Sequence, residues 1–466
     1  MRALRDTGVE PLLEERVAPA RVFAFAHAVD DIQVQRGRFV GQVDELDAER
    51  MRRRVGQQID ECDPGNHPAT AVGTGRDGRG LQTSGKQEEA FALACIEHDL
   101  VPVLIHDHEP SGHASTVAPG PSPPYSPLDC WLVRAITIIE GRLEVAERDV
   151  PQPAPDGVVV RVHGAGLNRA DLMQRAGHYP APPGVPADIP GLEFAGEVTA
   201  IGTNVGSVAG APAVGDRVFG ITAGGAQAEY VAVPAVQCAI VPADLDLVVM
   251  GGVPEAFMTA HDAMVTQARV VAGEWVLVHA VGSGVGTAAL QLARAFGARV
   301  VGTARTAEKI ERCRPLGLDA GIEPPRTADG ALDVDALAWS IVEATGGGAN
   351  VTLDLVCGDY VIADVNAAAL KGRIVCIGMI AGNRALLPIG SILAKRLTLI
   401  GTVLRARDVA EKGAATDAFV RDVVPLLASG QVAPVVEATL PMDRAVDAYA
   451  LLESDTTFGK VILDCR

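Results

Sequence analysis

A glycine-rich turn carries the strongest chemical signal in the sequence. An apolar strand at 274–280 precedes Gly282, Gly284 and Gly286, which open an amphipathic helix. Glycines at such a turn let the backbone approach a pyrophosphate, and the start of the helix offers unpaired N–H groups and a positive dipole. The turn lies inside a β-α-β unit, as a dinucleotide site requires. The pattern predicts a cofactor-binding turn made of Gly282, Ser283, Gly284, Val285 and Gly286. The alternative is that the glycines only allow close helix packing.

The next strand, residues 298–303, bears on the choice between NAD and NADP. Sites that prefer NAD place an acidic residue about 20 residues after the glycines. Here the strand ends without one, and the first carboxylate is Glu308. Arg305 and Lys309 can instead pair with a 2′-phosphate, the arginine with two parallel hydrogen bonds. The sequence therefore predicts NADPH, unless both side chains are only solvated charges at a helix start.

The surrounding pattern predicts an α/β fold. Short strands separated by glycines and prolines indicate a β-rich domain at 133–257. Strands and helices alternate across 258–400, which predicts a doubly wound parallel sheet of the Rossmann type. Residues 401–466 return to mixed helix and strand.

Residues 1–132 differ from the rest and are predicted to be a poorly structured extension. Loop-like composition fills 63–80 and 109–127, and only Glu88–His106 suggests a helix followed by a short strand. The residues His106, Asp107, His108, Glu109 and His113 could be drawn as a metal site. We expect none there, because ligands need a rigid scaffold.

Composition excludes several classes of protein. The chain has 466 residues, 48% hydrophobic and 21% charged, which is typical of globular domains. A net charge of −18 argues against a nucleic-acid-binding protein. The sequence has neither a long apolar run for a membrane span nor a secretory signal. The 8 cysteines show no zinc-ligand spacing, so we expect reduced thiols in a cytoplasmic protein.

Six motifs in order carry a family resemblance: GLNRADLMQRAGHYP (166–180), GLEFAGEV (191–198), GDRVFG (215–220), PEAFMTA (254–260), SGVGTAALQLARAFGA (283–298) and LKGRIVCIG (370–378). With these motifs, residues 133–466 resemble the zinc-independent, zeta-crystallin-like quinone oxidoreductases of the medium-chain dehydrogenase/reductase superfamily. The resemblance implies a GroES-like domain at 133–257, completed by 401–466, and a Rossmann domain at 258–400. It also implies NADPH, a site in the cleft between the domains, and a homodimer.

The resemblance bears on metal binding at Leu192 and Glu193. Zinc-dependent relatives carry a His-Glu pair here and a lobe of four cysteines elsewhere, and this sequence has neither. We therefore expect no metal, and Glu193 is predicted to be a structural carboxylate. Without a Lewis acid, alcohol dehydrogenation is disfavoured, which leaves a quinone or an activated alkene as the acceptor.

The resemblance also implies roles for particular residues. Asn168 would lie near the nicotinamide and its ribose, and Tyr179 could donate a hydrogen bond to the substrate oxygen. Asn168 and Tyr179 could each have a structural role instead, with Asn168 anchoring its loop. Thr259 would contact the nicotinamide or act as a helix N-cap. Gly378 and Met379 would line the nicotinamide.

Two departures from the family pattern and two further expectations complete the comparison with the family. Met173 stands where several relatives have a tyrosine, and Pro324 falls where relatives often have a tyrosine near the adenosine phosphate. Arg405 and Arg407 are expected to be surface charges. Relatives begin at the residue matching Val133, so we expect 1–132 to be upstream sequence translated from a mis-set start, with a regulatory extension as the alternative.

These observations predict an NADPH-dependent quinone oxidoreductase that transfers a hydride. An enoyl reductase and a non-enzymatic NADPH-binding protein are the alternatives. The physiological acceptor, and one- or two-electron reduction, stay open at this stage.

Overall fold

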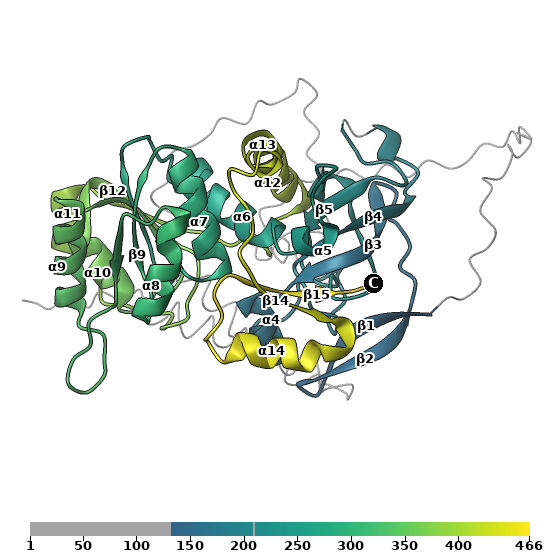
Figure 1. Ribbon diagram of the computed structural model, residues 1–466, viewed down its shortest axis with the longest axis horizontal. Coiled ribbons are helices and arrows are strands. Elements are labelled where there is room, and N and C mark those ends of the chain that lie inside the picture. The colour runs from purple at the N-terminus through teal and green to yellow at the C-terminus, as the bar shows by residue number, and fades with distance from the viewer. Residues whose placement is uncertain (1–131, 208–209) are drawn as a thin grey trace, which may run out of the picture. The chain divides into compact units, whose positions relative to one another are not determined.

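The computed structural model describes residues 132–207 and 210–466 (Figure 1). The expected extension lies outside the described residues except for Leu132, which begins strand β1. The segment 88–106 and the histidine cluster at 106–113 lie outside them as well.

A six-stranded parallel sheet forms the predicted Rossmann domain, with strand order β10-β9-β8-β11-β12-β13. The order reverses between β8 and β11, and dinucleotides bind at such a switch point. The strands are β8 (Trp275–Val278), β9 (Arg299–Thr303), β10 (Ala320–Ile322), β11 (Ala349–Asp354), β12 (Ala368–Cys376) and β13 (Thr398–Gly401). The helices between them are α7 (Gly284–Ala295), α8 (Ala307–Cys313), α9 (Val334–Thr345), α10 (Tyr360–Ala367) and α11 (Ile389–Lys395).

Helices cover both faces of this sheet, with α7 and α8 on one face and α9 and α10 on the other (Figure 1). Strand β8 is therefore apolar throughout. Val276 and Val278 pack in one core cluster with residues of α7, while Leu277 packs in another with Leu337 and Ile341 of α9. Continuous apolar runs of this kind are what a parallel sheet buried on both faces requires.

The β-rich domain is the predicted GroES-like one. Its seven-stranded sheet has the order β14-β15-β3-β4-β5-β7, with β6 also paired to β3. These strands are β3 (Gly157–Gly166), β4 (Glu193–Ile201), β5 (Arg217–Ile221), β6 (Tyr230–Pro234), β7 (Cys238–Ile240), β14 (Val436–Pro441) and β15 (Lys460–Asp464). A separate hairpin joins β1 (Leu132–Ile139) to β2 (Arg142–Asp149). The helices outside the parallel sheet include α4 (Arg169–Arg175), α5 (Leu247–Met250), α6 (Pro254–His261), α12 (Val409–Asp422), α13 (Val424–Ala428) and α14 (Ala445–Glu453).

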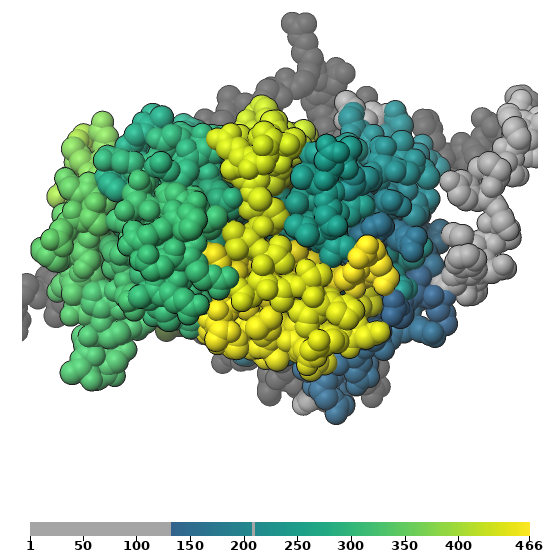
Figure 2. Space-filling model, viewed as in Figure 1, coloured from purple at the N-terminus to yellow at the C-terminus, as the bar shows by residue number. Residues whose placement is uncertain are grey.

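The C-terminal segment contacts both domains (Figure 2). Strand β15 pairs with β3 of the β-rich sheet. Just before it, the backbone N–H of Gly459 donates to the carbonyl of Gly282 at 2.8 Å. The chain therefore passes directly over the glycine-rich turn on its way back to the first domain.

Two further properties concern the described residues. None of their helices combines the length and apolar character needed to cross a bilayer. All five of their cysteines are free thiols: Cys238, Cys313, Cys357, Cys376 and Cys465.

Candidate functional site

The glycine-rich turn is a tight cradle at the start of α7. The hydroxyl of Ser283 caps the helix by accepting a hydrogen bond from the backbone N–H of Gly286 at 3.1 Å. A Cβ on Gly286 would lie 2.4 Å from the carbonyl oxygen of Ala280, and one on Gly284 would lie 2.5 Å from Cδ of Lys460. Gly286 thus allows the helix to pack against its own turn. The absence of a side chain at Gly284 leaves the room that the Lys460 side chain occupies. The turn suits close approach of a dinucleotide backbone.

Arg305 and Lys309 both bind Asp455, Arg305 at the carboxylate and Lys309 at the backbone carbonyl. Arg305 donates to Oδ2 of Asp455 at 2.8 Å, and Nζ of Lys309 donates to its carbonyl oxygen at 2.6 Å. Arg169 binds the other carboxylate oxygen. The Arg305 hydrogen bond, with Arg169, lowers the pKa of Asp455 to about 2. Asp455 therefore occupies both predicted phosphate ligands, with its carboxylate on Arg305 and its backbone carbonyl on Lys309.

A buried ion pair lies beside the glycine-rich turn. Nζ of Lys460 lies 2.6 Å from Oε1 of Glu193 and also donates to Oδ1 of Asn168 and the carbonyl of Leu167, each at 2.7 Å. Nδ2 of Asn168 donates to the same Glu193 oxygen at 2.9 Å. Asn168 therefore anchors its loop to two other segments of the chain. Sequence reasoning missed Lys460, although a lysine that opens an apolar strand indicates a buried partner.

Two more carboxyl groups surround this ion pair. Oε2 of Glu193 accepts a hydrogen bond from the backbone N–H of Glu255 at 2.8 Å. Burial, reinforced by the charge of Glu193, raises the pKa of Glu255 to about 8, so this group is protonated at neutral pH. Burial also raises the pKa of Asp171 to about 6, against hydrogen bonds from the backbone N–H groups of Asn168 and Gly191. Glu255 is thus a proton-holding group near the predicted site.

Tyr179 lies half-buried beneath a guanidinium group. Cζ of Arg405 lies 4.6 Å from the centre of the Tyr179 ring, and Arg405 also donates to the Tyr179 carbonyl at 3.0 Å. No residue in the described ranges hydrogen-bonds to the Tyr179 hydroxyl, and burial raises its pKa. The hydroxyl is therefore protonated at neutral pH and available as a donor.

The expectation that Arg405 and Arg407 are surface charges is wrong. Arg405 is only 4% exposed and donates to three neutral oxygens: the carbonyls of Tyr179 and Ala223 and the side chain of Gln174. Arg407 makes a two-pronged pair with Asp262 at 3.0 and 2.6 Å. Arg405 can be buried and Arg407 half-buried because their N–H groups meet acceptors from segments distant in the sequence.

The expectation that Thr259 could be a helix N-cap is also wrong. Helix α6 begins at Pro254, because proline suits the first helical turn, and Thr259 lies in the helix interior. Its Oγ1 is buried and has no hydrogen-bond partner among the described residues. An unpaired buried hydroxyl is unfavourable, so a ligand that hydrogen-bonds to it would relieve this cost.

Gly378 and Met379 follow strand β12 and differ in their surroundings. A Cβ on Gly378 would lie 2.4 Å from the carbonyl of Leu355, so the backbone there is closely packed. Met379 is 58% exposed and can contact a ligand or a second chain. Their expected contact with the nicotinamide stays a prediction.

Comparisons with known proteins identify the family. Residues 284–418 match the zinc-binding dehydrogenase family, and residues 154–243 match the alcohol dehydrogenase GroES-like domain. Quinone oxidoreductase-like protein 2 of Mus musculus is 30% identical over 326 residues, covering 69% of this chain and 88% of that protein. This chain belongs to the quinone oxidoreductase family of the medium-chain dehydrogenase/reductase superfamily.

Two further comparisons support this family assignment. Quinone oxidoreductase of Homo sapiens is 28% identical over 344 residues, covering 71% of this chain and 98% of that protein. The structure of a mycobacterial protein complexed with NADPH matches with a TM-score of 0.62 at 28% identity, covering 71% of this chain and 99% of that one. The expected family and fold are thereby confirmed, and the chain is an oxidoreductase with a nicotinamide cofactor.

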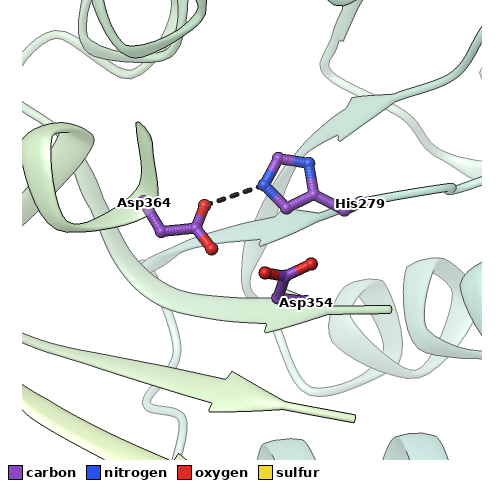
Figure 3. Close-up of side chains that lie close together, drawn as sticks. All are labelled: His279, Asp354 and Asp364. Carbon is purple, nitrogen blue, oxygen red and sulfur yellow. Dashed lines mark hydrogen bonds and ion pairs between the residues drawn. The ribbon is translucent and has the colours of Figure 1, made fainter. Parts of the chain in front are cut away.

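The described residues include a second buried polar cluster, which sequence reasoning missed. His279 follows β8, Asp354 ends β11, and Asp364 lies on α10 (Figure 3). Nε2 of His279 lies 2.7 Å from Oδ1 of Asp364, and Nδ1 lies 2.9 Å from the hydroxyl of Thr303. Asp354 accepts two backbone N–H bonds from the turn after β11. The cluster ties together the strand ends that support the glycine-rich turn.

Replacing Lys460 by methionine tests the ion pair. The variant K460M leaves the Glu193 carboxylate buried without its cation, so the free energy of unfolding should fall by about 3–5 kcal/mol. Urea denaturation measures this change. The double variant K460M/E193Q should recover part of the loss. The exposed-site control K371M should change stability by less than about 0.5 kcal/mol, and an equally small effect of K460M would contradict the proposed role.

Proposed function

We propose that this protein transfers a hydride from NADPH to a quinone or a similar electrophilic acceptor, without zinc. The observation that carries the proposal has two parts: the Tyr179 hydroxyl can donate a hydrogen bond to an acceptor, and Leu192 cannot bind a metal ion. The Tyr179 hydroxyl has no hydrogen-bond partner among the described residues, while Leu192 takes the place of the histidine that zinc-dependent relatives use. Both oxygens of the neighbouring Glu193 accept hydrogen bonds from protein groups.

In this proposal each group has a separate task. NADPH, when bound, supplies the hydride. The turn at 282–286 holds its pyrophosphate, and Arg305 with Lys309 holds its 2′-phosphate. Asn168, Thr259, Gly378 and Met379 face the nicotinamide. Tyr179 donates a hydrogen bond to the acceptor oxygen, on which negative charge develops during hydride transfer.

The preference for NADPH is linked to Asp455. Its carboxylate pairs with Arg305 and its backbone carbonyl accepts from Lys309, so a 2′-phosphate must displace Asp455 to reach both side chains. The phosphate carries more charge and more acceptor oxygens than a carboxylate, which favours the exchange. NADH has a neutral hydroxyl at this position, which gains no charge-assisted hydrogen bond by displacing Asp455.

We further propose a homodimer in the cytoplasm. Strand β13 lies at the edge of the parallel sheet, and edge strands offer unpaired backbone groups to a second chain. Apolar side chains near this edge are exposed: Ile380, Leu386, Ile389 and Leu393. The free thiols of the described residues agree with a reducing compartment.

Steady-state kinetics test the proposed reaction. Purified protein should oxidise NADPH with a panel of quinones and not with a panel of enoyl thioesters. The variant Y179F, which lacks only the hydroxyl, should lower kcat about ten- to hundredfold, because one transition-state donor is lost. Turnover restricted to enoyl thioesters would overturn the proposal in favour of an enoyl reductase. Tight NADPH binding without turnover on either panel would indicate a non-enzymatic role.

Two opposing variants test the cofactor assignment. R305A should lower kcat/KM for NADPH about tenfold or more, and leave kcat/KM for NADH nearly unchanged. D455N removes the competing carboxylate and should lower KM for NADPH about threefold, consistent with the small energies of partly exposed ion pairs. The matched control R314A removes an exposed arginine just after α8, which pairs with the exposed Glu311 of that helix. Equal use of NADH and NADPH by the unmodified protein would contradict the assignment.

The oligomeric state can be measured by light scattering. We expect a particle of twice the chain mass of 48.4 kDa. Leu393 is 71% exposed on α11, and L393E should shift the population to monomer by placing a charge in the proposed apolar interface. A monomer for the unmodified protein at micromolar concentration would rule out the proposed interface.

A further inference from the structure

A cavity of about 610 Å³ is lined in part by Arg405, the guanidinium group that lies over the Tyr179 ring. Its walls come from loops of the β-rich domain and from the start of α12. Much of the lining is apolar and includes Pro182, Pro183, Val185, Ala223 and Val233. This volume lies in the range of small-molecule sites, which combine apolar walls with a few polar groups.

Two buried cations line this cavity, and neither hydrogen-bonds to a carboxylate of the described residues. Arg405 is 4% exposed, and all three of its acceptors are neutral oxygens. Lys412, on the first turn of α12, is 6% exposed, and no described residue accepts a hydrogen bond from its Nζ. Burial lowers the pKa of both groups. A buried charge without a partner is costly, and a bound anion would remove that cost.

The remaining charged groups near the cavity balance these cations only in part. Arg407 also lines the cavity, and its charge is balanced by Asp262. Asp408, another lining residue, accepts from the backbone N–H of Glu411 at 2.8 Å, and its charge acts on Lys412 without a hydrogen bond to Nζ. Glu255 interacts with both Arg405 and Lys412, yet it is protonated at neutral pH. The cavity therefore keeps a net positive inner wall.

We propose that this cavity binds the carboxylate or phosphate of a small ligand with an apolar body, held by Lys412 and Arg405. Arg405 also contacts Tyr179, so an acceptor whose carbonyl reaches Tyr179 could place an acidic substituent in the cavity. The proposal names the substrate class of the same site and in that respect rests on the proposed function. A free anion such as phosphate would use the same two cations.

The test compares two acceptors and three lysine variants. The acceptors are a naphthoquinone and its carboxylate-substituted analogue, and the measured quantity is the ratio of their kcat/KM values with NADPH. K412Q should lower the ratio of acidic to neutral acceptor about tenfold, because a charge-assisted hydrogen bond is lost. K412R keeps the charge and should retain most of the ratio. K371Q removes an exposed lysine on β12 and should leave the ratio unchanged. Thermal melting confirms that each variant is folded.

Binding of inorganic phosphate, measured by titration calorimetry, separates the two sources of the anion. A ratio that falls in K412Q supports an acidic acceptor. An unchanged ratio with phosphate binding lost in K412Q supports a free-anion ligand at the same site. An unchanged ratio together with unchanged or absent phosphate binding overturns the proposal. If neither quinone is reduced, the proposed function fails, and the phosphate measurement alone decides whether the cavity binds anions.

Discussion

The buried pair of Lys460 and Glu193 is the interaction on which the site depends. It joins the last strand of the chain to a strand of the β-rich sheet, and Asn168 is bonded to both partners. Lys460 also lies against Gly284, where a Cβ would collide with it. One ion pair thus positions the loop of Asn168, the glycine-rich turn and the backbone of Glu255. A charge pair in so dry a place is stable only because every polar atom has a partner.

Charge balance distinguishes the two ends of the proposed site. At the adenosine end, the carboxylate of Asp455 pairs with Arg305, and its backbone carbonyl accepts from Lys309. At the acceptor end, neither Arg405 nor Lys412 hydrogen-bonds to a carboxylate of the described residues, although the charge of Asp408 acts on Lys412. In the proposed function, the first arrangement would make cofactor binding an exchange of one anion for another. In the proposed acceptor site, the two buried cations would favour acceptors that carry negative charge.

Local sequence patterns predicted the fold and the conformation of the glycine-rich turn because those features depend on neighbouring residues. The apolar strand, the glycines and the helix lie within about two dozen positions of one another, and the structure has them as predicted. The family motifs led to the correct superfamily for the same reason. Thr259 was placed wrongly at a helix start because the role of Pro254 in starting that helix was overlooked.

Long-range partners could not be predicted from the sequence. Asp455 meets Arg305 across 150 positions, and Lys460 meets Asn168 across 292. Arg405 was expected at the surface because its acceptors lie 182 to 231 positions away. The charge of a residue such as Asp455 or Lys460 does not indicate which distant residue it will contact. Only the return of the C-terminal segment to the β-rich domain, over the glycine-rich turn, brings Asp455 and Lys460 to their partners.

The most direct test is an experimental structure of the complex with NADPH. The account predicts that the 2′-phosphate lies within hydrogen-bond distance of both Arg305 and Lys309, and that Asp455 has left the Arg305 guanidinium. The pyrophosphate should lie against the turn at 282–286. A complex in which Asp455 keeps its bond to Arg305 and the 2′-phosphate lies elsewhere would contradict the account.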